Sequence, residues 1–359
     1  MVFLNHGSFG ACPRPVFEVY QRWQRELERQ PVELLARRYE GLIEEAKSRL
    51  AGFLGARPED LVFCPNATSG MNVVARSLPL GTGDEVLVTN HEYGAVSRLW
   101  EHVCARTGAA LVVRTLAPGP ALVDELWSAV TARTRVVSVS HVTSATALRF
   151  PVEEVCARAR SEGILSAVDG AHAPGQIELE LDALGADFYA GNCHKWLCAP
   201  KGSGFLHVRP EHQATITPQV IGWGEDEGSF AARHRWQGTR DPAAYLAVPA
   251  AIDFLAEHGW DEVRGRCYGL ARAARVRLAE LTGLAPLAPD ETWLGQMTAA
   301  ELPECDIDAL KRRLYDEHRI EVPVYRFEER SVVRASFQGY NDDSDLDALV
   351  AALRAELQL

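Results

Sequence analysis

Short β-rich runs alternate with helical stretches over the first two thirds of the chain, and this alternation restricts the fold more than any other feature. The runs lie at residues 61–64, 85–89, 110–114, 135–140, 164–168, 186–190 and 204–208. Such a rhythm predicts a sheet wound with helices. Two of the runs, VVSVS and ILSAV, are apolar on both faces, as is typical of parallel strands covered on both sides. The sequence therefore predicts an α/β fold with a largely parallel sheet.

The two ends of the chain differ from this central part. Before residue 54, apolar residues recur at steps of three to four residues, which predicts two helices. The pattern after Asp241 predicts helices at 242–258, 261–282, 307–318 and 346–353, and strands at 293–302, 320–324 and 332–336. This pattern indicates a second, smaller α+β unit that begins near residue 245.

Charge and residue usage exclude several classes of protein. The 359 residues carry 37 Lys and Arg against 49 Asp and Glu, a net charge of −12, so nothing attracts the chain as a whole to nucleic acid or an anionic membrane. The 8 cysteines form no C-x-x-C pair and the 11 histidines no H-E-x-x-H motif, which disfavours a disulfide scaffold and a metal site. No G-x-G-x-x-G follows the first strand. Without a signal-peptide pattern or an apolar run of about 18 residues, we expect a soluble, cytoplasmic protein.

Polar residues follow three of the predicted strands, at the edge where open α/β sheets bind ligands. The run PNATSG opens a helix, and it suits either a bound phosphate or an ordinary helix cap. Asp169 comes directly after ILSAV, as a turn former or as the partner of a protonated ring nitrogen. Lys195 follows the strand at 186–190, where it is a candidate Schiff-base amine or a solvated surface residue. Each structural alternative explains one of these residues well, but explains the ordered set poorly.

The order of these motifs resembles the pyridoxal phosphate enzymes of fold type I, and more narrowly the class V aminotransferase and cysteine desulfurase superfamily. NATSG is followed by DGAH and then by NCHKW, with Lys195 26 residues after Asp169. LNHGSFG, TNHEYGAV, GTRDPAAYLAVPAAIDFL and VRASFQGYND are similar to the isopenicillin N epimerase-like branch. The resemblance spans nearly the whole chain. It implies a mainly parallel seven-stranded sheet in a large cofactor-binding domain, residues 15–245, and a smaller domain formed by residues 1–14 and 246–359.

Pyridoxal 5'-phosphate is the cofactor that the resemblance implies, and the motif residues take their roles from it. Lys195 matches the lysine that binds the cofactor as a Schiff base and later carries the α-proton, and His194 precedes it as in the family. Asp169 matches the carboxylate that pairs with the pyridine nitrogen. Tyr93 occupies the position that stacks on the ring, with His91 as the nearby alternative.

Other implied positions contact the rest of the cofactor. Ala67 and Thr68 match the phosphate-binding turn, and Asn192 lies where a side chain often contacts the phosphate. His172 occupies the position near the ring oxygen or the carboxylate. Ser144 stands where many relatives carry an asparagine near the ring oxygen.

Substrate binding and assembly are implied in the same way. Gly238 and Thr239 match a segment that reaches the phosphate of the opposite subunit, which implies a homodimer with shared active sites. Arg334 matches the arginine that binds the α-carboxylate of a small-molecule, amino-acid-type substrate through its guanidinium fork. The substrate entrance is assigned to three residues of the N-terminal segment, namely Asn5, His6 and Ser8.

One departure from the family narrows the chemistry. Desulfurases of this group need a loop cysteine before the carboxylate-binding arginine, and the interval VPVYRFEERSVVR contains none. The resemblance therefore implies an enzyme that acts on the α-carbon of an amino acid or amino-acid-derived substrate, as an epimerase, a racemase or an aminotransferase. A carbon-sulfur β-lyase acting on cysteine or a cysteine conjugate is the alternative, and a regulatory module that binds the cofactor is the non-enzyme alternative. The acid or base opposite Lys195 stays open among Tyr93, His91 and His172.

Overall fold

The central sheet has seven strands in the order β2-β8-β7-β6-β5-β3-β4 in the computed structural model, which describes residues 1–359. The strands are β2 (Leu61–Cys64), β3 (Glu85–Thr89), β4 (Ala110–Arg114), β5 (Thr134–Ser140), β6 (Leu165–Gly170), β7 (Phe188–Asn192) and β8 (Gly204–Val208). Only β8 runs antiparallel to its neighbours, so the sheet is mainly parallel. The predicted fold class is confirmed: β2, β3, β4 and β8 have the predicted bounds, and those of β5, β6 and β7 are displaced by one or two residues.

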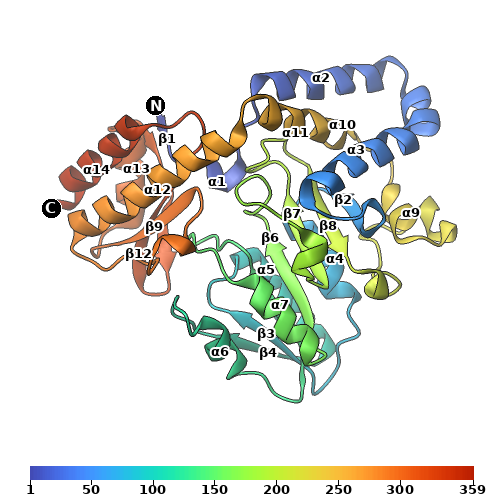
Figure 1. Ribbon diagram of the computed structural model, residues 1–359, viewed down its shortest axis with the longest axis horizontal. Coiled ribbons are helices and arrows are strands. Elements are labelled where there is room, and N and C mark those ends of the chain that lie inside the picture. The colour runs from blue at the N-terminus through green and yellow to red at the C-terminus, as the bar shows by residue number, and fades with distance from the viewer.

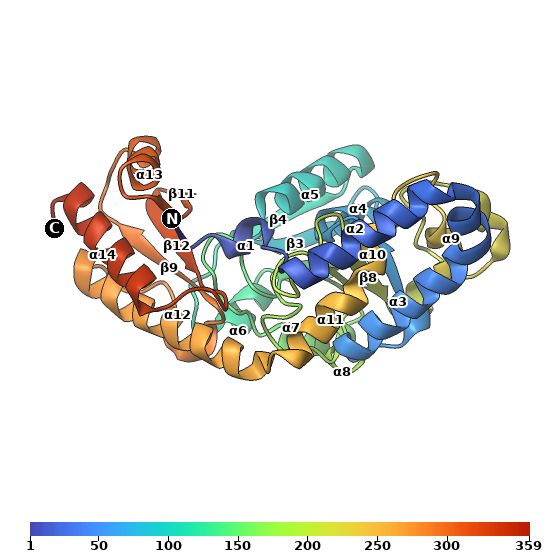
Figure 2. The same ribbon diagram turned by 90° about the horizontal axis from the view of Figure 1, so that it is seen from above.

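Helices cover both faces of this sheet (Figures 1 and 2). They are α4 (Ala67–Ser77), α5 (Gly94–Thr107), α6 (Leu122–Trp127), α7 (Val152–Ser161) and α8 (Leu181–Leu184). In β3, Val86 and Val88 pack in one hydrophobic cluster with α5, while Leu87 packs in another with α7. Because successive strand residues point to opposite faces, a strand with two covered faces needs consecutive apolar residues, as the centre of β3 has here.

Helices of the N-terminal region and of the chain after β8 pack beside the sheet (Figure 1). They are α1 (His6–Phe9), α2 (Arg14–Arg29), a π-helical turn (Glu33–Arg38), α3 (Tyr39–Leu54), α9 (Phe230–Arg235), α10 (Ala243–Leu246) and α11 (Val248–Glu257). The single helix predicted at 242–258 is wrong, since α10 and α11 are separated at Ala247. Pro249, in the first turn of α11, has no N–H to continue a helix from α10.

The C-terminal part holds two small sheets, one in the order β11-β12-β9 and one that pairs β1 with β10. Its elements are α12 (Trp260–Thr282), β9 (Met297–Leu302), α13 (Ile307–Asp316), β10 (Ile320–Glu321), β11 (Val324–Phe327), β12 (Arg330–Ser336) and α14 (Asp343–Leu357). The strand predicted at 293–302 begins only at Met297, because residues 291–293 form a 3-10 turn. The strand predicted at 320–324 is divided at Pro323, which cannot donate to a ladder.

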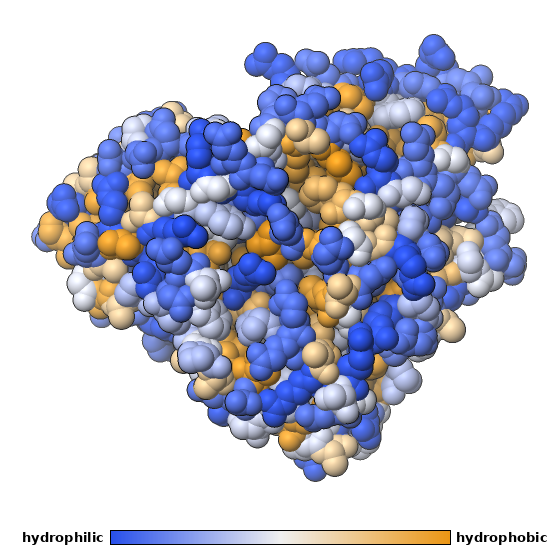
Figure 3. All heavy atoms as spheres, in the orientation of Figure 1, coloured by the Kyte–Doolittle hydropathy of each residue, from blue (hydrophilic) through white to orange (hydrophobic).

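The first residues of the chain pack with its last third. β1 (Val2–Phe3) pairs in parallel with β10, and Leu4 lies in the hydrophobic cluster of α12, α13 and α14. The domain bounds stay a prediction. Figure 3 shows a mostly hydrophilic face with a notch between the C-terminal elements and the rest, where hydrophobic residues gather. None of the helices has the length and apolar character needed to cross a membrane.

Candidate active site

A polar cavity of about 240 Å³ lies beyond the carboxyl ends of β5, β6 and β7. The residues predicted from sequence that line it are Ser8, Thr68, Tyr93, Ser144, Asp169, His172, Asn192, His194 and Lys195. They come from segments up to about half the chain apart, and parallel strands bring them to one edge. The cavity is therefore where the sheet geometry leads us to look for bound ligands.

Lys195 lies in the turn that follows β7, and its amine has an altered acidity. The pKa of Lys195 is lowered to about 7, mainly by burial and also by the charge of Arg334, while the charge of Asp169 opposes the shift. The Nζ atom lies 3.1 Å from Nε2 of His172. An amine with this pKa is about half unprotonated at pH 7 and mostly unprotonated at higher pH, and the unprotonated form is the one that attacks a carbonyl.

The N-terminal segment closes over the backbone of this lysine. A Cβ at Gly10 would overlap the carbonyl oxygen of His194, and Gly10 has φ +72°. His6, fully buried, places Nε2 3.0 Å from the carbonyl oxygen of Lys195 and Nδ1 2.9 Å from the hydroxyl of Tyr340. The segment thus fixes the turn from behind, and only a glycine allows this approach.

Asp169 stands near the end of β6 with only 4% of its surface exposed. Its Oδ1 accepts a hydrogen bond from the amide of Ala171 at 2.9 Å, and its other oxygen accepts none from the protein. Burial raises the pKa of Asp169, although the Ala171 amide and the charge of Lys195 oppose the shift. The second oxygen of this buried carboxylate therefore has no donor or cation within the protein, which is unfavourable unless a ligand supplies one.

The N-terminus of α4 faces the same cavity. The side chain of Asn66 caps the helix by accepting from the amide of Ser69 at 2.9 Å, and Oδ1 of Asn192 accepts from the amide of Ala67 at 2.8 Å. The amide of Thr68, second in the helix, has no acceptor within the helix, and Thr68 lines the cavity. Free amides and the helix dipole make this end suitable for an anion.

Arg334, on β12, reaches the rim of the cavity from the C-terminal part. It is 4% exposed and donates to the carbonyl oxygen of Ser144 at 2.7 Å and to the hydroxyl of Ser8 at 3.2 Å. Its Nε has no partner, and burial lowers its pKa. Because both serines line the cavity, the guanidinium adds a buried positive charge beside it.

Several predicted site residues lie outside the cavity. His91 is buried, with its ring bonded to Thr146 at 2.8 Å and to the carbonyl oxygen of Leu116 at 3.0 Å. Asn5 donates to Glu321 at 2.7 Å. The others not in the lining are Arg334, which contacts two lining serines, Ala67 and His6, both buried, and Gly238 and Thr239, which are exposed. Their roles stay predictions.

Some lining residues were not assigned to the site from the sequence, although Asn66 and Ala171 belong to the motifs PNATSG and DGAH. They are Phe9, Asn66, Ser140, Val142 and Ala171. Ser140 ends β5, so the same rule that singled out Asp169 could have found it. Trp196 was also missed as a partner of the site: its indole nitrogen lies 3.3 Å from Nδ1 of His172.

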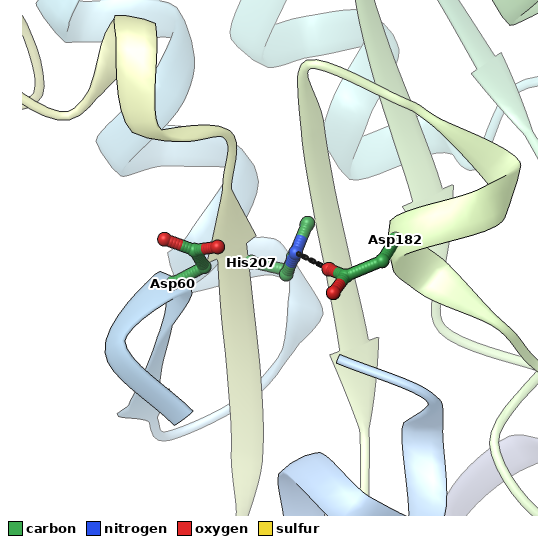
Figure 4. Close-up of side chains that lie close together, drawn as sticks. All are labelled: Asp60, Asp182 and His207. Atoms are coloured by element: carbon green, nitrogen blue, oxygen red, sulfur yellow. Dashed lines mark ion pairs between the residues drawn. The ribbon is translucent and has the colours of Figure 1, made fainter. Parts of the chain in front are cut away.

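A second cluster of polar side chains lies at Asp60, Asp182 and His207 (Figure 4), with ligand-type atoms within 4.8 Å of one another. His207 Nε2 is 3.4 Å from Asp182. Both oxygens of Asp60 already accept hydrogen bonds, from Arg57 at 2.9 Å and from Gln213 at 2.6 Å. Asp60 thus already has its partners within the protein, so the polar cavity is the stronger candidate for chemistry.

The cavity fits the cofactor that the sequence implies. Pyridoxal 5'-phosphate carries a phosphate, a pyridine nitrogen and an aldehyde, and these need an anion site, a carboxylate and an amine. The α4 N-terminus, the free oxygen of Asp169 and the low-pKa amine of Lys195 provide these three groups around one cavity. The unpartnered oxygen of Asp169 is the strongest of these three indications, because a buried carboxylate oxygen without a donor is unfavourable unless a ligand supplies one.

Comparison with known proteins agrees with this fit. The family model described as aminotransferase class-V matches residues 13–349. The chain is 39% identical to an isopenicillin N epimerase of Amycolatopsis lactamdurans over 98% of this chain and 94% of the relative, and 29% identical to a putative L-cysteine desulfhydrase of Oryza sativa subsp. japonica over 99% and 79%. An apo cysteine desulfurase structure from Thermococcus onnurineus NA1 has a TM-score of 0.87 at 22% identity, covering 99% of this chain and 94% of that one. This chain therefore belongs to the aminotransferase class-V family and is a pyridoxal phosphate-dependent enzyme.

Proposed function

We propose that this enzyme changes the configuration at the α-carbon of an amino acid or amino-acid-derived substrate, as an epimerase or racemase. The observation that carries the proposal is the pairing, around one cavity, of a low-pKa amine on Lys195 with a buried guanidinium on Arg334. Such a pair suits a substrate that presents a carboxylate next to an acidic C–H bond. Similarity over nearly the full length to an isopenicillin N epimerase supports the same choice.

Each residue has a part in the proposed reaction. The bound cofactor supplies an aldehyde for the substrate amine and a ring that takes up electrons released at the α-carbon. Arg334 binds the α-carboxylate, with Ser8 and Ser144 holding its guanidinium in place. Lys195 Nζ removes the α-proton on one face. Asp169 would hold the pyridine nitrogen of the bound cofactor, and its negative charge would favour the protonated form of that nitrogen.

Other residues around the cavity would hold the cofactor in this proposal. Thr68 and Asn192 act at the phosphate end, the latter by fixing the first amide of α4. Tyr93 is 46% exposed at the cavity and can cover the ring. Its hydroxyl is our first choice for the proton donor on the face opposite Lys195.

Proton exchange tests the proposed activity. A panel of L-amino acids and cysteine-containing peptides is incubated with the enzyme in D2O, and deuterium at the α-carbon and chirality are followed together. Exchange with loss of optical purity and no other product supports the proposal. Conversion to a 2-oxo acid with transfer of the amino group would instead assign an aminotransferase.

A carbon-sulfur β-lyase is the second candidate, supported by similarity to a putative L-cysteine desulfhydrase. A lyase releases pyruvate and sulfide from cysteine, so the same incubations are assayed for both. Persulfide chemistry is disfavoured, because the nearest cysteine before Arg334 is Cys305, outside the loop that precedes the arginine. Release of pyruvate without α-deuteration of the remaining substrate would replace the epimerase proposal.

The proposed enzyme is a cytoplasmic homodimer. Gly238 and Thr239 are exposed, and the nearby segment that packs on residues 232–236 exposes Ile221 at 61% and Trp223 at 85%. An exposed apolar segment of this kind is typical of an interface. The 8 unpaired cysteines suit a reducing compartment. Sedimentation of the purified protein at twice 39.5 kDa supports the dimer, and a monomer that keeps full activity contradicts the shared site.

A further inference from the structure

Trp196 contacts His172 on the side away from the cavity. The indole nitrogen lies 3.3 Å from Nδ1 of His172, and both side chains are almost completely buried. An indole N–H only donates, so Nδ1 must be the acceptor and carry no proton. In a neutral imidazole the proton then resides on the other nitrogen, Nε2.

The other ring nitrogen faces the reactive amine. Nε2 of His172 lies 3.1 Å from Nζ of Lys195. With the proton on Nε2, the ring donates to the lone pair of an unprotonated amine, and both nitrogens of the ring are satisfied. The opposite tautomer would place two N–H groups against each other at Nδ1 and leave a buried donor unpaired.

The ring stays neutral because of its surroundings. Burial lowers the pKa of His172 well below its ordinary value, and the positive charge of Arg334 lowers it further. No acidic side chain bonds to the ring, so the indole alone selects between the two neutral tautomers.

Trp196 is itself held in one orientation. It is fully buried, and its ring lies 4.9 Å from that of His6, centroid to centroid. His6 is also hydrogen-bonded to the carbonyl oxygen of Lys195 at 3.0 Å. The same histidine therefore contacts both Lys195 and Trp196, which are joined by one peptide bond. The loop of Gly175 packs directly on the backbone of Trp196, where no side chain would fit. The indole N–H therefore has a fixed direction.

We propose that Trp196 is a positioning residue whose indole N–H holds His172 in the tautomer with its proton on Nε2, so that His172 presents a donor to Lys195 and to the cavity. Under this arrangement His172 is not the base that removes the α-proton. The catalytic consequence of this tautomer rests on the proposed function. The tautomer itself is a property of the protein without cofactor.

Nitrogen-15 NMR of the full chain with labelled histidine tests the tautomer directly. Signals of His172 are identified by their loss in His172→Gln. The wild type is expected to show a neutral ring protonated on Nε2. Trp196→Phe, which keeps an aromatic ring but removes the donor, is expected to lower the Nε2–H population to about half. A wild-type ring protonated on Nδ1, or an unchanged tautomer in Trp196→Phe, overturns the proposal.

Trp100→Phe is the matched control. Trp100 is also fully buried, but its indole nitrogen has no hydrogen-bond partner. Loss of an indole there leaves the His172 signals unchanged if the effect of Trp196 is specific. If Trp196→Phe fails to fold, the wild-type spectrum still decides the tautomer.

The cofactor-loaded enzyme gives a second readout. In Trp196→Phe, the pH midpoint of the visible absorption band is expected to shift by roughly 0.5 unit or more, and in Trp100→Phe it stays in place. In a His172→Gln background, the Trp196 substitution should no longer shift the band. A shift that persists there overturns the proposed route through His172. Failure to bind pyridoxal phosphate at all would sink the proposed function, while the NMR result would still stand.

Discussion

Two buried aspartates, one near the end of β6 and one directly before the neighbouring strand β7, have opposite surroundings. Asp187 comes directly before β7, is 5% exposed, and accepts hydrogen bonds from the amide and hydroxyl of Ser166 at 2.8 and 3.0 Å. Arg209 and His212 add donors at 3.1 and 3.0 Å. Asp169, 4% exposed near the end of β6, has a single amide donor and a free oxygen toward the cavity.

The pKa shifts of the two aspartates have opposite directions for this reason. Burial raises the pKa of Asp187, but hydrogen bonds from His212 and Ser166 more than offset it and hold the pKa below its ordinary value. Burial raises the pKa of Asp169, and its one amide does not compensate. A carboxylate whose lone pairs are all satisfied stabilises the fold, whereas one that lacks donors at the ligand-binding edge of the sheet is expected to meet its partner in a ligand.

The largest expected effect is at the lysine beside the unsatisfied aspartate. Lys195→Ala removes the amine that binds the cofactor covalently, so we expect the visible band of lysine-bound cofactor to disappear and activity to fall by a factor of ~10⁴ or more. Lys201→Ala, an exposed lysine of the same loop, is the control. Retention of the band in Lys195→Ala would show that Lys195 is not the residue that binds the cofactor covalently.

Asp169→Asn separates charge from shape at the cavity. The amide keeps the volume and the Ala171 contact but cannot hold a proton on a ring nitrogen, so turnover is expected to fall about 10²- to 10³-fold. Folding should be little affected. Steady-state kinetics measure the first effect and urea denaturation the second; normal turnover with reduced stability would make Asp169 a structural residue like Asp187.

Asp187→Asn should show the reverse pattern. The amide group turns a donor toward Arg209 or His212 and loses the charge that pairs them, so the free energy of unfolding is expected to fall by about 2–3 kcal/mol. Turnover per folded molecule should stay near wild type. Urea denaturation of both variants at one pH makes the test, and equal losses of stability would contradict the division of roles.

The sequence predicted one side of this comparison and not the other. Asp169 follows an apolar run and precedes Lys195 by a recognisable spacing, so local pattern and chain order were enough to single it out. Asp187 also adjoins a strand, but its donors are set by the pairing of β6 with β7 and by the turn after β8. No local pattern contains those contacts.

Longer-range contacts explain the other gaps. Arg334 was predicted from its motif. Its hydrogen bonds to Ser8 and Ser144 join three segments that are distant in the sequence, so no single segment could predict them. Trp196 stands next to Lys195 in the chain, but its contact with His172 depends on how two loops meet. The strands were predictable because apolar runs are local, while the partners of buried polar groups are a property of the tertiary fold.

The smallest expected effect is the pH dependence of the free energy of unfolding, which compares Lys195 with Asp187. Burial lowers the pKa of Lys195 from 10.5 to about 7, so between these values the unfolded chain binds more protons than the folded one, and the free energy of unfolding of the cofactor-free protein rises with pH. Relative to Lys195→Met, which does not titrate, the wild type should gain about 2 kcal/mol between pH 7 and pH 9. Asp187 has a linkage of the same sign in an acidic range, because its pKa is also lowered: its stabilising contribution is present above its ordinary value of 3.8 and is lost as the pH falls through the lower folded value. Lys201→Met serves as the control for the alkaline series, and a flat difference between wild type and Lys195→Met would show that water reaches the amine as freely as it does in the unfolded chain.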